Sequence, residues 1–274
     1  MALIFALESC NSKKSDLSVL NIGISTNYSN ADAMKQNGYN FVEENVGRFL
    51  VPDKVEDEFI TIMGYLNDSS LPIKACNTFL PRTLKSVGPD AVHPEILKYA
   101  ETAFRRAQKV GANIIVFGSG GSRSIPEGFS RDQAQSQFVE LCKQLSPIAE
   151  KYNVIIVLEP LNKNECNFIN SVAEGGEIVK ETNHPNFKLL ADIYHMKMDD
   201  ESPENIVLYG DLIKHVHIAE KQDRAVPGTY DEDFSPYFDA LRKIKYDGDI
   251  SIEARWTDFD SQMPTAIKSI KQQL

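Results

Sequence analysis

The sequence predicts an α/β fold of a single domain, a parallel eight-stranded (β/α)8 (TIM) barrel. Short apolar segments alternate with longer amphipathic segments eight times along the 274 residues, which is typical of a parallel sheet connected by helices. No linker rich in Pro, Gly or Ser divides the chain, and barrels of this kind commonly reach this length. The last four predicted strands also end in side chains that bind metals, and barrel enzymes build their active sites at the carboxyl ends of successive strands.

The first half of the chain is predicted to contain four strands separated by helices. The strands are short and rich in β-branched residues, as strands buried on both faces are. Gly38 and Gly111 suit the ends of two helices, and Pro94 suits a helix start. We expect strands over residues 19–24, 39–46, 73–78 and 113–118, and helices over residues 30–37, 53–67 and 94–110.

The second half continues the same alternation. The fifth strand begins at Val154 and is apolar until Glu159, where Pro160 stops it. We expect the later strands over residues 187–192, 213–219 and 249–253, and helices over residues 131–152, 172–182, 203–208, 237–245 and 261–273.

Composition and charge exclude several classes of partner. A hydrophobic content of 42% is enough for a substantial core. Asp and Glu number 39 against 29 Lys and Arg, and a net charge of −10 would repel phosphate backbones, so we expect no nucleic acid partner. No apolar run approaches the roughly 20 residues of a membrane span. The sequence leaves a homo-oligomer open.

The N-terminal residues carry a separate signal. The first seven residues are apolar, and Leu7-Glu8-Ser9-Cys10 followed by polar residues resembles a bacterial lipoprotein signal with its lipid-accepting cysteine. We therefore expect residues 1–18 to be an N-terminal tail and residues 19–274 to be the catalytic barrel. The tail is either a signal remnant with a lipid anchor at Cys10, which would make the protein periplasmic and membrane-anchored, or an ordinary frayed terminus of a cytoplasmic protein.

Four strand-end residues, Glu159, Asp192, His217 and Glu253, are predicted to lie side by side on one rim of the barrel. Three carboxylates and an imidazole suit Mn²⁺, Mg²⁺ or Co²⁺ and accept Zn²⁺. Without a cation the carboxylates would suppress each other's ionisation. We therefore predict one divalent ion held by this quartet; for any single member the alternative is a solvated acid at a strand end.

With this quartet in place, the sequence from about Leu20 onward resembles the xylose isomerase-like TIM barrels, the sugar isomerases and epimerases that include the D-tagatose and D-psicose 3-epimerases. The resemblance implies that the quartet binds one divalent ion. Glu165 and His195 match positions that orient substrate hydroxyls in the ketose 3-epimerases. Arg224 is similar to their basic residue after the histidine strand, one position later. Apart from the resemblance, Trp256 follows Glu253 closely and would either stack on a sugar ring or cover the barrel mouth.

The implied activity is a divalent-metal-dependent sugar or sugar phosphate isomerase or epimerase. Glu159 and Glu253, on opposite faces of the substrate, would exchange the α-proton through a metal-stabilised enediolate. The alternatives are a 3-keto-glycoside lyase or hydrolase on the same metal site and a non-catalytic sugar-binding barrel. A site like that of endonuclease IV, a three-zinc DNA repair enzyme of the same superfamily, is not expected, because no histidine precedes His93, no D-x-H follows His217 and the net charge is negative.

Two further features have more than one interpretation. The Gly-rich turn Gly118-Ser119-Gly120-Gly121-Ser122-Arg123 would hold a phosphate or form a flexible loop, and Arg123 would alternatively pair with a site carboxylate. His215 is expected to point away from His217 and to pack behind the barrel.

Overall fold

The computed structural model describes residue 17, residues 20–66 and residues 69–274. Cys10, with the predicted lipid-anchor segment around it, lies outside the described residues. Within the described ranges, no helix is both long enough and apolar enough to cross a membrane.

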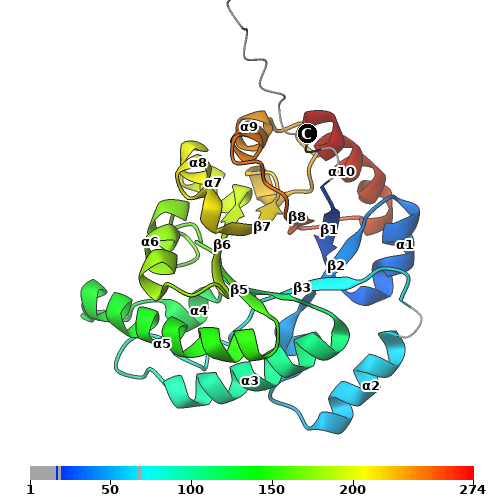
Figure 1. The fold of residues 1–274 in the computed structure, drawn as a ribbon. Helices are drawn as coiled ribbons and strands as arrows, with labels where there is room; N and C mark the ends of the chain where they lie inside the picture. Colours follow the sequence, from blue (N-terminus) through cyan, green and yellow to red (C-terminus); the bar gives the residue numbers. More distant parts are fainter. Residues whose placement is uncertain (1–16, 18–19, 67–68) are drawn as a thin grey trace, which may run out of the picture.

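The described residues form a closed barrel of parallel strands, in which every strand pairs with its neighbours in sequence and β1 pairs with β8 (Figure 1). This arrangement confirms the predicted fold class. The strands are β1 (Ile22–Ser25), β2 (Phe41–Asn45), β3 (Ile73–Asn77), β4 (Ile114–Phe117), β5 (Ile155–Leu158), β6 (Phe187–Asp192), β7 (Ile213–Ile218) and β8 (Asp249–Ile252).

Helices surround the barrel and connect successive strands (Figure 1). They are α1 (Ala31–Gln36), α2 (Glu56–Leu66), α3 (His93–Val110), α4 (Gly120–Arg123), α5 (Arg131–Lys151), α6 (Val172–Thr182), α7 (Ile193–Met198), α8 (Glu204–Leu208), α9 (Ser235–Lys243) and α10 (Phe259–Gln273).

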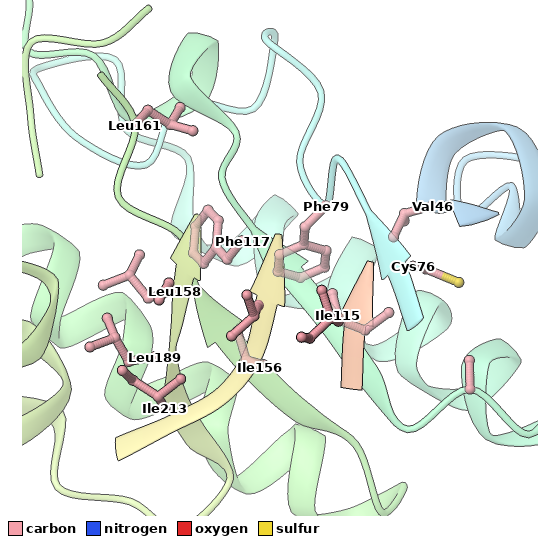
Figure 2. Packing of buried hydrophobic residues seen from close by; sticks show 14 of the residues in the cluster. Val46, Cys76, Phe79, Ile115, Phe117, Ile156, Leu158, Leu161, Leu189 and Ile213 are labelled. Carbon is pink, nitrogen blue, oxygen red and sulfur yellow. The ribbon is translucent and has the colours of Figure 1, made fainter. Parts of the chain in front are cut away.

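Alternate residues of each strand face the inside and the outside of the barrel, because side chains alternate along a strand. The outward-facing residues pack against the helices, and Figure 2 shows Ile115, Phe117, Ile156 and Leu158 in this layer. Phe79 meets Phe117 edge to face at 5.3 Å between ring centroids, an arrangement that aromatic pairs favour.

A second, smaller apolar cluster lies among the inward-facing residues and includes Val116, Val157 and Leu190. Polar residues continue these inward-facing rows beyond the apolar ones, because Glu159 follows Val157 by two positions and Asp192 follows Leu190 by two. The carboxyl ends of the strands therefore bring polar side chains such as Glu159 and Asp192 to the mouth of the barrel.

The predicted elements differ from the observed ones mainly at their ends. Strand β6 and helix α6 begin and end where they were predicted. The short helices α4 and α7 were not predicted. Helix α7 begins directly after β6, where the Asp192 side chain accepts a hydrogen bond from the backbone N–H of His195 at 3.2 Å.

Candidate metal centre

The structure brings the four predicted strand-end residues together at the barrel mouth. One donor atom each from Glu159, Asp192, His217 and Glu253 lies within 4.8 Å of the others. The Nδ1 atom of His217 is 3.1 Å from Glu159 Oε1, 3.4 Å from Glu253 Oε2 and 3.9 Å from Asp192 Oδ2. The Nδ1 atom of His217 therefore faces three carboxylates at once.

These separations suit a bound divalent ion. Two ligands of an ion with bonds of about 2.1 Å lie roughly 3.0 Å apart in an octahedron and roughly 3.4 Å apart in a tetrahedron. Among the described residues, the buried Asp192 Oδ2 atom has no hydrogen-bond partner, and a metal would supply one. Carboxylate and imidazole ligands also commonly bind Mn²⁺, Mg²⁺, Co²⁺ or Zn²⁺ in proteins. The residues present fit the ion.

The two glutamates of the quartet have opposite pKa shifts. Burial raises the pKa of Glu159, with further contributions from Glu253 and Asp192, against the opposing effect of His217. Burial also acts to raise the pKa of Glu253, but His217 and Arg224 outweigh it and lower the pKa to about 2. Burial acts to lower the pKa of His217, yet the charges of Glu43 and Glu253 raise it well above its ordinary value. The two glutamates therefore differ in their surroundings, which lower the pKa of Glu253 and raise that of Glu159.

Gly118 makes room for the Glu159 side chain. A Cβ atom at residue 118 would lie 2.0 Å from Glu159 Oε2, well inside any allowed contact. A residue larger than glycine at the end of β4 would therefore clash with the side chain that follows the neighbouring strand β5.

Two side chains hold Glu253 from opposite sides. Asn77, at the end of β3, donates a hydrogen bond to Glu253 Oε1 at 2.7 Å. Arg224 donates to Glu253 Oε2, and its guanidinium also lies 3.4 Å from Glu165 Oε1 and stacks on the Tyr194 ring, 4.6 Å from its centroid. Arg224 therefore reaches the site despite its one-position offset in sequence.

His195 presents an unused N–H group near the quartet. The backbone N–H of Asn162 donates to His195 Nδ1 at 3.2 Å, and a backbone N–H can only donate. Nδ1 is therefore an acceptor, and the hydrogen of the neutral ring is on Nε2. That atom is buried and has no hydrogen-bond partner in the described part of the chain, and it lies 3.5 Å from Asp192 Oδ2.

A model of the family described as xylose isomerase-like TIM barrel matches residues 31–273. The chain belongs to this family. It is 34% identical over 117 residues to an L-ribulose 3-epimerase of Methylomonas sp. (strain DH-1), a match that covers 42% of the chain and 41% of the relative. It is 28% identical over 127 residues to a 3-dehydro-D-guloside 4-epimerase of Escherichia coli (strain K12), with 46% and 48% covered. The matches thus span less than half the length of these relatives.

Solved structures extend the likeness of fold over nearly the whole barrel. The apo form of a 3-keto-D-glucoside 4-epimerase from E. coli superposes with a TM-score of 0.77 at 20% sequence identity, covering 93% of the chain and 100% of that structure. At this identity the likeness concerns the fold alone.

The prediction for His215 was wrong. Residues two apart on a strand face the same side, so His215 and His217 of β7 both point into the barrel, with ring centroids 5.1 Å apart. Sequence reasoning also missed Glu43 of β2, whose carboxylate contacts both rings. A signal for it was present, because Glu43 lies two residues after Phe41 and therefore faces the same side of β2.

Among the described residues, Arg123 hydrogen-bonds to backbone carbonyls and to no carboxylate of the site. Its side chain is fully buried and donates hydrogen bonds to backbone carbonyls of three segments, including those of Phe117 at 3.1 Å, Glu159 at 2.8 Å and Phe168 at 3.3 Å. Burial lowers the pKa of the guanidinium. Arg123 therefore joins the ends of β4 and β5 to the loop before α6.

Glu165 and Trp256 occupy less central positions. Glu165 accepts a hydrogen bond from the Asn162 side chain at 3.2 Å, and 40% of its own side chain is exposed, which leaves it accessible to a ligand. Trp256 is half-buried and packs against Phe259 with ring centroids 4.7 Å apart.

Proposed function

We propose that this xylose isomerase-like barrel is a divalent-metal-dependent isomerase or epimerase of a small sugar, free or phosphorylated. The observation that carries the proposal is the meeting of Glu159, Asp192, His217 and Glu253 within 4.8 Å at the barrel mouth. The named relatives, which are epimerases of a ketose and of a keto-glycoside, support this reaction class over the lyase alternative.

The proposed site residues divide into a metal-binding set and a substrate-binding set. Glu159, Asp192, His217 and Glu253 would hold one Mn²⁺, Co²⁺, Mg²⁺ or Zn²⁺ ion. When bound, such an ion supplies Lewis-acid stabilisation of negative charge on substrate oxygens.

Glu159 and Glu253 carry the proton transfer in this proposal. They follow β5 and β8, which lie apart around the barrel, so they reach a bound sugar from different sides. Either residue would take the proton from the carbon beside the carbonyl on its own face, and the other would return a proton to the opposite face. In the reverse direction the roles exchange, and an enzyme that uses only one face performs an aldose–ketose isomerisation instead.

The neighbouring polar groups orient the sugar. The Nε2–H group of His195 is available to donate a hydrogen bond to a substrate oxygen. Arg224 and Glu165 offer a donor and an acceptor on the outer side of the site, where they lie 3.4 Å apart. Trp256 would cover the apolar face of the sugar ring.

The test is a substrate screen by proton NMR with Mn²⁺-loaded protein and a panel of ketoses, ketose phosphates and 3-keto-glycosides. Conversion between epimers or between aldose and ketose supports the proposal. An unsaturated product with a released leaving group would establish the lyase instead. Sugar binding without turnover, by protein that demonstrably contains metal, would establish a binding barrel.

A further inference from the structure

A buried carboxylate joins two histidines directly beneath the quartet. Glu43 Oε2 is 2.7 Å from His215 Nε2, and Glu43 Oε1 is 2.9 Å from His217 Nε2. All three side chains are fully inaccessible to solvent. The residues are 172 and 174 positions apart in sequence and meet only because β2 and β7 face each other across the barrel interior.

These contacts are hydrogen bonds rather than the ligand set of a second ion. Two ligands of a tetrahedral ion with bonds of about 2.1 Å are roughly 3.4 Å apart. The distance of 2.7 Å between His215 Nε2 and Glu43 Oε2 is shorter and matches a charge-assisted N–H···O bond, and His217 Nε2 is hydrogen-bonded to the same oxygen at 3.2 Å. The three residues therefore form a hydrogen-bonded network with the carboxylate at its centre.

The network assigns the two ring nitrogens of His217 to different partners. An ionised carboxylate only accepts hydrogen bonds, so the Nε2 atom that faces Glu43 carries its hydrogen. Nδ1 is then the nitrogen turned toward the quartet, at 3.1 Å from Glu159 Oε1. Rotating the ring by a half-turn would break both arrangements.

His215 hydrogen-bonds to the same Glu43 oxygen as His217 does. It contacts the same carboxylate at 2.7 Å, and its ring lies edge-on to that of His217 and 6.3 Å from the Phe41 ring. With two imidazoles on one carboxylate and no solvent to replace either, the carboxylate has one orientation that satisfies both.

We propose that Glu43, itself oriented by His215, is the positioning residue that directs the Nδ1 atom of His217 toward the metal. The inference rests on the proposed metal centre and names the group that prepares it. Carboxylates that bind the second nitrogen of a metal-ligating histidine commonly strengthen metal affinity in this way.

The experiment compares Glu43→Gln and Glu43→Leu with wild type, and Glu44→Gln serves as the matched control. Glu44 is the next residue of β2 and is equally buried, but its carboxylate accepts from the backbone N–H groups of Tyr28 and Asn45 instead. Mn²⁺ affinity of chelator-treated protein is measured by calorimetry. In parallel, NMR of ¹⁵N-histidine-labelled, metal-free protein follows the Nε2 proton of His217.

We expect Glu43→Gln to weaken Mn²⁺ binding about 10-fold and Glu43→Leu about 100-fold, the range seen when such second partners are removed. Glu44→Gln should bind Mn²⁺ like wild type. The slowly exchanging, downfield Nε2 proton of His217 should be present in wild type and Glu44→Gln, shifted in Glu43→Gln and absent in Glu43→Leu.

Unchanged Mn²⁺ affinity in both Glu43 variants, or an unaltered His217 Nε2 proton, would overturn the inference. If wild type binds no Mn²⁺, the proposed function fails, while the NMR comparison still decides whether Glu43 holds that proton. If Glu43→Leu does not fold by circular dichroism, the isosteric Glu43→Gln decides in both measurements.

Discussion

Replacing Gly118 with alanine should remove metal binding through a single steric contact. The new Cβ would lie 2.0 Å from Glu159 Oε2, and ordinary contact begins at 3.4 Å, so the carboxylate must move about 1.4 Å. Metal–oxygen bonds tolerate displacements of only about 0.2 Å. Glu159 would leave the quartet, and we expect Mn²⁺ affinity to fall more than about 100-fold, a loss of at least about 2.8 kcal/mol in binding free energy.

The assay is calorimetric titration of chelator-treated protein with Mn²⁺, together with thermal unfolding of the metal-free protein. Gly64→Ala is the matched control, because a Cβ at residue 64 of helix α2 meets no atom within 4 Å. It should bind Mn²⁺ like wild type and gain roughly 0.5–1 kcal/mol of stability from the better helix former. A folded Gly118→Ala protein with wild-type Mn²⁺ affinity would refute the assignment of Glu159 to the metal.

Four further predictions concern the metal, its pH dependence, the chemistry and the N-terminus. Wild type should contain one metal ion per chain and Asp192→Asn should contain none, which metal analysis would check. At a free Mn²⁺ concentration of 100 times Kd, wild type should be about 2.7 kcal/mol more stable to thermal unfolding than the metal-free protein. The pKa of His217 is raised, so Mn²⁺ must displace a proton when it binds, and Mn²⁺ affinity should keep increasing with pH above the ordinary pKa range of histidine. Calorimetry in buffers of different ionisation enthalpy should detect the released proton. Binding heats that do not depend on the buffer would contradict this prediction. Epimerisation in deuterated water should place deuterium beside the carbonyl, and Glu159→Gln or Glu253→Gln with measured metal content should suppress turnover, whereas turnover by the metal-loaded double mutant would exclude both residues as bases. If Cys10 carries lipid, full-length protein in a bacterial host should partition with membranes and Cys10→Ser should release it, whereas an unmodified N-terminal mass would remove the lipid anchor.

The sequence was sufficient to predict the barrel and the position of the quartet. Strand-end residues follow apolar segments directly in sequence, and the rule that parallel strands end on one rim then places them together. The direction of the His215 side chain could also have been predicted from the sequence. Side chains alternate along a strand with a period of two residues, so His215 and His217 must face the same side.

Other contacts depend on how distant segments meet and are not visible in sequence. Glu43 lies 172 residues before His215, and no local pattern connects them. Arg123 looks like a ligand-binding residue until the folded loops surround it with carbonyl oxygens. Its role depends on backbone geometry that forms only when β4, β5 and the following loop are in place.

Arg224 illustrates how a loop compensates for a sequence offset. Both Asp223 and Arg224 have left-handed backbone conformations, with φ of 59° and 51°. Such conformations are costly for residues other than glycine, and they persist where the surroundings impose them. Here the loop is fixed by Glu220, whose buried carboxylate accepts backbone N–H groups of Gly228 at 2.7 Å and Tyr230 at 2.7 Å. The turn redirects Arg224 into the site.

The two proposed bases differ in their surroundings, and this difference bears on the reaction. Glu159 is buried against Gly118 and close to the other carboxylates, and this burial raises its pKa. Glu253 is held between Asn77 and Arg224, which favour its ionised form. An isomerase that returns the proton to the face from which it came needs only one carboxylate to change its charge. Two carboxylates with opposite pKa shifts on different sides of the site suit proton exchange on the two faces of one carbon, and the Glu159→Gln and Glu253→Gln variants test each of them separately.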